Sequence, residues 1–251
     1  MSVAASLRRR LYGTAQRVYG AALTRRYART GMPWRVHDRT LRIDPGVRHL
    51  VPHEPEPELY RFVREHVRPG AQVLDVGAFL GIYAILEAHL AGPGGRVVTV
   101  EPTAWSAAMA RRHIAYNAAG AAPVTLVEAA AGERPGRAVL HEYEQPYVNA
   151  LAEAPDGIGA PRRREVEVRT LDEICAAERL APTFIRMDVQ GAEWQALAAG
   201  LDNVIFPGWI GAPEIRSLMR VADVGLAPYL DKGNFTQNLP NKPAEYFSAG
   251  G

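Results

Sequence analysis

The sequence has a single cysteine, Cys175, and no apolar run long enough to span a bilayer. One thiol cannot form an internal disulfide or a cysteine-based metal cluster, and no spacing of histidines and carboxylates indicates a metal, so we predict no metal site. A continuous apolar segment is also missing near the first residue, so we expect no secretory signal and a cytoplasmic protein. The net charge of +2 is too small to indicate a nucleic-acid-binding protein.

Acidic residues are absent from residues 1–31, which carry seven arginines. Apolar residues in this segment fall near helical spacing, which is typical of a basic amphipathic helix. The preferred interpretation is a solvated helix packed on the main domain. The alternative is weak contact with an anionic membrane surface.

Downstream, short apolar runs alternate with helical patterns, and this alternation predicts a doubly wound, mainly parallel α/β sheet. We expect a short strand pair over 34–46, strands at 72–77, 96–102, 123–130 and 182–188, and helices at 59–67, 82–90 and 104–117. We predict that two further segments, 136–143 and 164–174, form the strands of an inserted β-hairpin around a polar loop.

Five residues fall at or just beyond the carboxyl ends of the predicted strands, where open α/β sheets bind ligands. They are Asp75, Gly77, Gly81, Glu101 and Asp188. We expect Gly77 to allow a tight turn off its strand and Gly81 to let the next helix begin close to a ligand. The segment therefore predicts a binding site for a nucleotide-like cofactor.

The turn "VLDVGAFLG" (73–81) departs from the dinucleotide fingerprint G-x-G-x-x-G, because Phe79 stands where the second glycine would let a pyrophosphate approach. Alone, the turn is compatible with a methyl donor, a dinucleotide or a purely structural bend. Glu101, twenty residues after Gly81, is placed to accept hydrogen bonds from both ribose hydroxyls. The two features together favour S-adenosylmethionine, an adenosine without phosphates.

These segments resemble the FkbM family of S-adenosylmethionine-dependent methyltransferases over roughly residues 50–200. The matching pieces are "VLDVGAFLGIYA", "GPGGRVVTVEP", "VTLVEAAAGERPG", "VEVRTLDEI" and "IRMDVQGAEWQAL". The resemblance implies a Rossmann-like methyltransferase fold and O-methylation of a hydroxyl on a sugar or other small metabolite. It also implies cofactor contacts from Ala78 and Phe79 in the first turn, and from Glu128 and Ala129 beside the adenine.

Asp188 is the leading candidate for orienting and deprotonating the acceptor hydroxyl, although it could instead cap the helix that follows. Glu193 is a second catalytic candidate, and its position in the first turn of that helix also suits the helix dipole. His141 is an alternative base, with a half-buried structural role as the preferred interpretation. Asn149 is a candidate substrate contact, and a solvent-facing loop residue is the alternative.

The final segment, 201–251, does not continue this pattern and instead resembles part of the nucleotide-sugar-binding half of GT-B glycosyltransferases. The pieces are "NVIFPGWI", "LMRVADVGLAPY" and "NLPNKPAEYFSAG". We therefore expect an N-terminal segment (1–49), a methyltransferase domain (50–200) and a glycosyltransferase-like fragment that could complete the sheet. A glycosyltransferase-related fragment and a non-catalytic cofactor-binding protein stay open as alternative functions.

Overall fold

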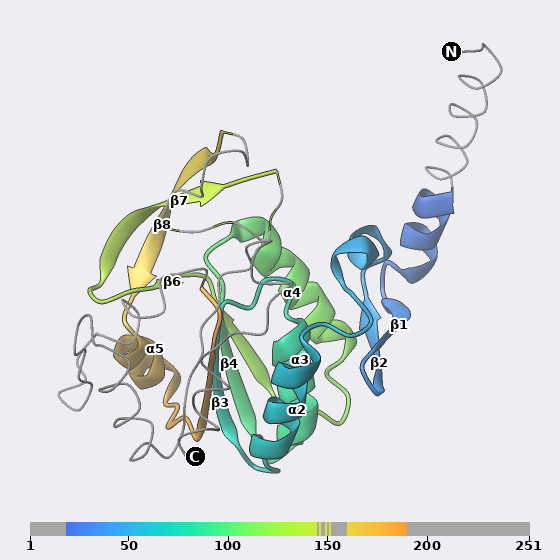
Figure 1. Ribbon diagram of the computed structural model, residues 1–251, viewed down its shortest axis with the longest axis horizontal. Coiled ribbons are helices and arrows are strands. Elements are labelled where there is room, and N and C mark those ends of the chain that lie inside the picture. The colour runs from blue at the N-terminus through green and yellow to red at the C-terminus, as the bar shows by residue number, and fades with distance from the viewer. Residues whose placement is uncertain (1–18, 145, 147–148, 150, 152–159, 190–251) are drawn as a thin grey trace, which may run out of the picture.

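A four-stranded parallel sheet forms the centre of the computed structural model (Figure 1), which describes residues 19–144, 146, 149, 151 and 160–189. Its strand order is β5-β4-β3-β9. The strands are β3 (Gln72–Val76), β4 (Arg96–Val100), β5 (Val124–Val127) and β9 (Phe184–Met187). All three neighbouring pairs are parallel, so every carboxyl end lies on the same edge.

The strand order creates a topological switch point between β3 and β9. The chain runs outward from β3 to β4 and β5, and then returns to the other side of β3 as β9. Connections diverge to opposite sides at such a point, which leaves a crevice beyond the carboxyl ends of the two strands. A functional site is therefore expected at the carboxyl ends of β3 and β9.

Helices cover both faces of the sheet, which confirms the predicted fold class. On one face, α2 (Pro57–His66), α3 (Ile82–Ala91) and α4 (Ala104–Tyr116) lie together, and α5 (Leu171–Glu178) lies on the other (Figure 1). The alternation of β3 produces this division, because Val73 packs into the core on the α2 and α3 side while Leu74 packs into the core of α5.

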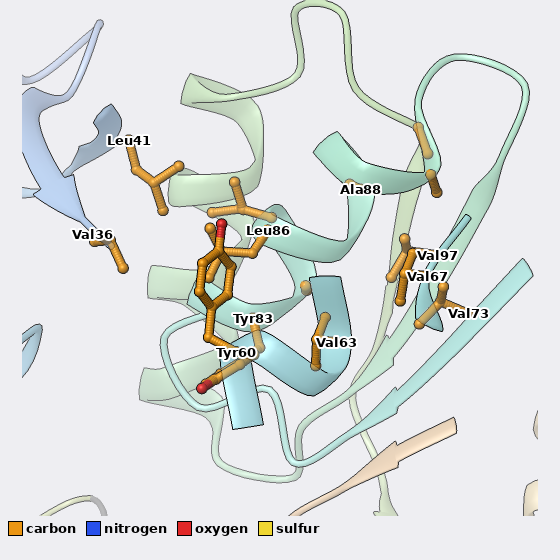
Figure 2. Close-up of a cluster of buried hydrophobic side chains, with 14 of the residues drawn as sticks. Val36, Leu41, Tyr60, Val63, Val67, Val73, Tyr83, Leu86, Ala88 and Val97 are labelled. Atoms are coloured by element: carbon orange, nitrogen blue, oxygen red, sulfur yellow. The ribbon is translucent and has the colours of Figure 1, made fainter. Parts of the chain in front are cut away.

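An antiparallel hairpin precedes the central sheet, as predicted. It consists of β1 (Met32–Val36) and β2 (Arg39–Ile43), and a 3-10 turn follows over Pro45–Leu50. Figure 2 shows side chains of this hairpin beside those of α2, α3 and the sheet, all within one core. Residues 19–27 are helical. No helix in the described part of the chain is both long and apolar enough to cross a membrane.

A second sheet overhangs the carboxyl edge of the first (Figure 1). It contains β6 (Ala130–Ala131), β7 (Gly136–Glu142) and β8 (Arg162–Arg169), in the order β6-β8-β7. The pairing of β7 with β8 confirms the predicted hairpin. The third strand of the central sheet, however, ends at Val127 and does not continue to residue 130, because Ala130 and Ala131 pair with β8 instead.

The prediction of strand through residues 171–174 was wrong, because α5 begins there. Thr170 caps the helix: its hydroxyl accepts the Glu173 N–H at 3.1 Å, and the Glu173 carboxylate accepts the Thr170 N–H at 3.0 Å. This reciprocal capping box satisfies two backbone donors and fixes where strand gives way to helix.

Candidate functional site

A cavity of about 130 Å³ lies at the carboxyl edge of the central sheet. We call it the edge cavity. Its walls come from the ends of β3, β4 and β9, from the chain around β6, and from the second sheet and its loop. Of the residues predicted as site residues, six line it: Gly77, Phe79, Glu101, Ala129, Asn149 and Asp188.

Gly77 makes the turn off β3 that shapes the cavity floor. Its φ of +94° lies in the region that favours glycine, and its N–H donates to Val100 O at 2.9 Å. A Cβ added at Gly77 would lie only 1.9 Å from the carbonyl oxygen of Asp188. The glycine therefore lets the backbone after β3 contact the backbone after β9, directly at the switch point.

Phe79 and Glu101 are fixed to each other. The Phe79 backbone has a φ of +47°, a conformation uncommon for a residue with a side chain, and its N–H donates to Glu101 Oε2 at 2.8 Å. The other carboxylate oxygen of Glu101 accepts the Thr103 N–H at 2.8 Å. The carboxylate of Glu101 is thus held in one orientation at the cavity wall.

Burial dominates the electrostatics of Glu101. Its side chain is almost completely buried, and this desolvation raises the pKa of Glu101 to about 6, although the N–H groups of Thr103 and Phe79 act in the opposite direction. The carboxylate is therefore ionised at neutral pH and becomes protonated in mildly acidic solution.

Three residues predicted to contact the cofactor lie close to the cavity without lining it. Gly81 is the N-cap of α3 and has a φ of +74°. A Cβ added at Gly81 would lie 3.0 Å from the Cβ of Ala110 on α4, so the missing side chain makes room for that helix. Ala78 is buried, and its N–H donates to Val100 O at 3.0 Å. Asp75 is completely buried beneath the cavity, where the Thr99 hydroxyl donates to it at 2.6 Å.

A buried arginine connects Asp75 to the cavity. Arg186, on β9, donates from Nη1 to Asp75 Oδ1 at 2.9 Å and from Nη2 to Asp188 Oδ2 at 3.2 Å. Its guanidinium also lies 4.2 Å from the centre of the Tyr83 ring. Burial opposes the charge of Arg186, but the carboxyl groups of Asp75, Asp188 and Glu87 raise its pKa above the usual range.

Glu87, on α3, completes this buried cluster. It is fully buried, and neither carboxyl oxygen has a hydrogen-bond partner among the described residues. Desolvation, together with the negative charge of Asp75, raises its pKa well above the usual value, while Arg186 acts in the opposite direction. Burial thus favours the neutral form of Glu87, while Arg186 donates to the two aspartates, Asp75 and Asp188.

The remaining candidates lie at different distances from the cavity. Asn149 contributes its amide, whose oxygen accepts the Tyr143 N–H at 2.8 Å. Glu128 is exposed and forms an ion pair with Arg111 of α4. Its neighbour Ala129 lines the cavity, and Glu128 is not among the described lining residues. His141 is buried on β7 and is not among the described lining residues. Glu193 lies outside the described residues.

Sequence reasoning did not select Arg186 or Thr103 as site residues. A signal for Arg186 existed, because a charged residue inside a short apolar strand must find an opposite charge when the strand is buried. There was little indication in the sequence that Thr103 belongs to the site, since its contribution is a backbone N–H that donates to Glu101. Its place in the "EPT" segment after β4 becomes informative only once the carboxylate of Glu101 is known to fold back onto it.

Comparison with known proteins places the chain in a family. Residues 75–209, more than half of the 251-residue chain, match the family described as the methyltransferase FkbM domain, so the chain belongs to that family. The domains of this family are described as methyltransferase domains. The family match extends past residue 200, and the predicted glycosyltransferase-like fragment lies outside the described residues.

Solved structures similar to the chain include two methyltransferases. A protein described as an rRNA methylase from Clostridium thermocellum is 20% identical, with a TM-score of 0.27, over 30% of this chain and 41% of its own. The O-methyltransferase from Bacillus cereus in complex with SAH is 30% identical, with a TM-score of 0.27, over 32% of this chain and 38% of its own. The chain thus spans about two fifths of the length of each structure. No curated protein matches the chain.

The chemistry of the edge cavity fits S-adenosylmethionine, the methyl donor predicted from the sequence. Its charged lining residues are Glu101 and Asp188, and no lysine, arginine or histidine is found among the described lining residues. A diphosphate would lack a countercharge in such a cavity, whereas a sulfonium cation and a ribose diol suit two carboxylates. The apolar wall formed by Val100 and Ala129–Ala131 is suited to an adenine ring.

Proposed function

We propose that this enzyme transfers the methyl group of S-adenosylmethionine to a hydroxyl of a sugar or another small metabolite. The observation that carries the proposal is the position of Glu101 after β4 and of Asp188 after β9, on either side of β3, where both line one cavity without a basic residue among its described lining. Glu101 would hold the ribose, and the Gly77–Phe79 turn would bind the amino-acid end of the cofactor. When bound, S-adenosylmethionine supplies an electrophilic methyl group.

Asp188 is proposed as the group that orients the acceptor hydroxyl and takes up its proton on a carboxylate oxygen. Its side chain is 42% exposed, its Oδ2 lies 3.2 Å from Arg186 Nη2, and the residue lines the edge cavity. The backbone N–H of Asp188 donates to Val76 O at 2.8 Å, which extends the β3–β9 ladder to the residue itself. Rigid placement matters here, because methyl transfer requires an in-line arrangement of the acceptor oxygen.

Arg186 has a supporting role in this proposal. By donating to Asp188 Oδ2 it fixes how the carboxylate points. Asn149 is proposed as an acceptor contact, because its amide oxygen is already held by the Tyr143 N–H and its NH₂ group is the part that a substrate could reach. Glu193, outside the described residues, is kept as a second catalytic candidate.

Titration calorimetry with S-adenosylhomocysteine, followed by a methyl-release assay on sugar acceptors, tests the proposal. We expect binding of the cofactor product and methyl transfer to at least one hydroxyl acceptor. Tight binding of a nucleotide sugar without binding of S-adenosylhomocysteine would favour the glycosyltransferase alternative. Cofactor binding without turnover on any hydroxyl acceptor would instead contradict the O-methylation that we propose.

A further inference from the structure

A second and larger opening adjoins the edge cavity. It has a volume of about 710 Å³, and we call it the hairpin cleft because the β7–β8 hairpin forms one of its walls. Thr103, Pro146 and Asn149 line both the edge cavity and the hairpin cleft. A molecule in the cleft would therefore lie against the same residues that border the cofactor cavity.

We propose that the hairpin cleft binds the methyl acceptor, and that the acceptor is an uncharged, polyhydroxylated ring that packs against Trp105. This inference rests on the proposed function, and it adds the location of the acceptor site and the chemistry of its ligand. Three features of the cleft carry it: an exposed indole on one wall, an inward-facing charged segment on the other, and a balance of charge between them.

Trp105 forms the apolar part of the first wall. It lies in the first turn of α4, next to the segment that holds Glu101, and 44% of its surface is exposed. A tryptophan normally buries most of its large ring, so exposure at the rim of a cleft indicates a binding surface. The flat face of an indole packs against the C–H face of a sugar ring, while its edge tolerates water.

The second wall is the inward face of the hairpin, where the residue pattern changes along the strands. On β8, alternate residues Val168 and Val166 are buried, and the same face continues with Arg164 and Arg162. On β7, buried Leu140 is followed on its face by Glu142, which lies directly opposite Arg162. The face is thus apolar where it covers the central sheet and charged only where it borders the cleft.

The charges on this wall balance. Arg164 Nε lies 3.1 Å from Glu142 Oε1, and the positive charge of the remaining arginine, Arg162, is offset by Glu144, which also lines the cleft. Such a wall presents donors and acceptors side by side without a strong net field. A ring with several hydroxyls can use both kinds of group at once. A phosphate or carboxylate would gain from the arginines but would be repelled by the two glutamates.

The first experiment measures the acceptor dependence of methyl transfer for Trp105→Ala. We expect KM for a neutral acceptor to rise roughly tenfold or more, while the dissociation constant for S-adenosylhomocysteine stays within about twofold. Val139→Ala is the matched control, because Val139 is a similarly exposed apolar residue, 47% exposed, and does not line the cleft. An unchanged KM in Trp105→Ala would overturn the cleft proposal and leave methyl transfer intact.

The second experiment tests the ligand class directly, by saturation-transfer NMR with a panel of probes. The panel contains methyl glycosides of neutral hexoses, glucuronic acid, glucose 6-phosphate and a simple alkyl alcohol. We expect the neutral glycosides to bind best, and binding to weaken in Trp105→Ala and in Arg164→Gln. Preference for either acidic sugar, or for the alkyl alcohol, would overturn the inference. Because NMR needs no cofactor, glycoside binding without S-adenosylhomocysteine binding would contradict the proposed function alone.

Discussion

Arg186 holds Asp188 at the mouth of the edge cavity, with Nη2 and Oδ2 3.2 Å apart, and binds Asp75 behind it at 2.9 Å. The ion pair with Asp75 is buried, with side-chain exposures of 7% and 0%. The ion pair with Asp188 is half exposed and therefore weaker. One guanidinium thus connects the buried core of the sheet to the proposed catalytic carboxylate.

Replacement of this guanidinium by an apolar side chain should destabilise the protein. Arg186→Met leaves the buried charge of Asp75 uncompensated, and loss of one partner from a buried pair costs about 3–5 kcal/mol of unfolding free energy. Urea denaturation measures the change. The double variant Arg186→Met/Asp75→Asn should recover part of the loss, because it also removes the orphaned charge. A double variant as unstable as the single one would show that packing against Tyr83 matters more than charge.

Gly77→Ala should disrupt the switch point. The new Cβ would meet the carbonyl oxygen of Asp188, and alanine is also strained at a φ of +94°. We expect a loss of about 1–3 kcal/mol from backbone strain alone, with a further loss from the clash, and weaker binding of S-adenosylhomocysteine as Asp188 is displaced. Thermal denaturation and titration calorimetry measure these effects.

Gly94→Ala is the control for this prediction. A Cβ at Gly94 meets no atom within 4 Å, and the residue has no positive φ. The control should change stability by no more than about 0.5 kcal/mol. If Gly77→Ala behaved like Gly94→Ala, the close contact between Gly77 and Asp188 would not be important for the site.

Much of the fold could be predicted from the sequence, since apolar runs and helical patterns alternate strictly from β3 to α4. The end of β5 could not be predicted in the same way. The segment "VEAAA" is equally compatible with one long strand, and only the partner of Ala130 and Ala131 on β8 decides that the chain leaves the sheet at that point. Tertiary pairing overrode the local pattern.

In the candidate site, too, some features could be predicted from the local sequence and others could not. Gly77 and Glu101 were predictable because strand ends and turns are local features. The role of Gly81 was not, because its close neighbour is Ala110, on a helix whose distance from α3 only the packed structure defines. The residue at which α5 begins could have been predicted, since Thr170 and Glu173 have the spacing of a capping box.

Asp188→Asn tests the proposed proton acceptor. The amide keeps the size of the side chain but cannot take up a proton, so we expect kcat to fall by roughly 10²- to 10⁴-fold. The dissociation constant for S-adenosylhomocysteine should change little. Single-turnover methyl transfer to a hydroxyl acceptor, followed over a range of pH, gives the measurement. Activity close to that of the parent enzyme would assign Asp188 a capping or structural role instead.

Glu101 should make cofactor binding depend on pH near 6. Its carboxylate is ionised above that value and accepts hydrogen bonds from ribose hydroxyls best in that form, so the affinity for S-adenosylhomocysteine should increase as pH rises through about 6. Stability should change in the opposite direction. Because the pKa of Glu101 is raised from its usual 4.5 to about 6 in the folded protein, its contribution is full below 4.5 and is lost as pH rises through 6.

Glu101→Gln separates these two effects. The amide cannot ionise, so both pH dependences attributed to Glu101 should disappear, and cofactor affinity at pH 7.5 should fall roughly ten- to hundredfold, the loss expected for hydrogen bonds to a charged group. Titration calorimetry between about pH 5 and 8, together with urea denaturation over the same range, supplies both measurements. Glu128→Gln is the control, because Glu128 is an exposed acid paired with Arg111 that does not line the edge cavity. If the parent enzyme bound S-adenosylhomocysteine equally well on both sides of pH 6, Glu101 would not be the ribose ligand.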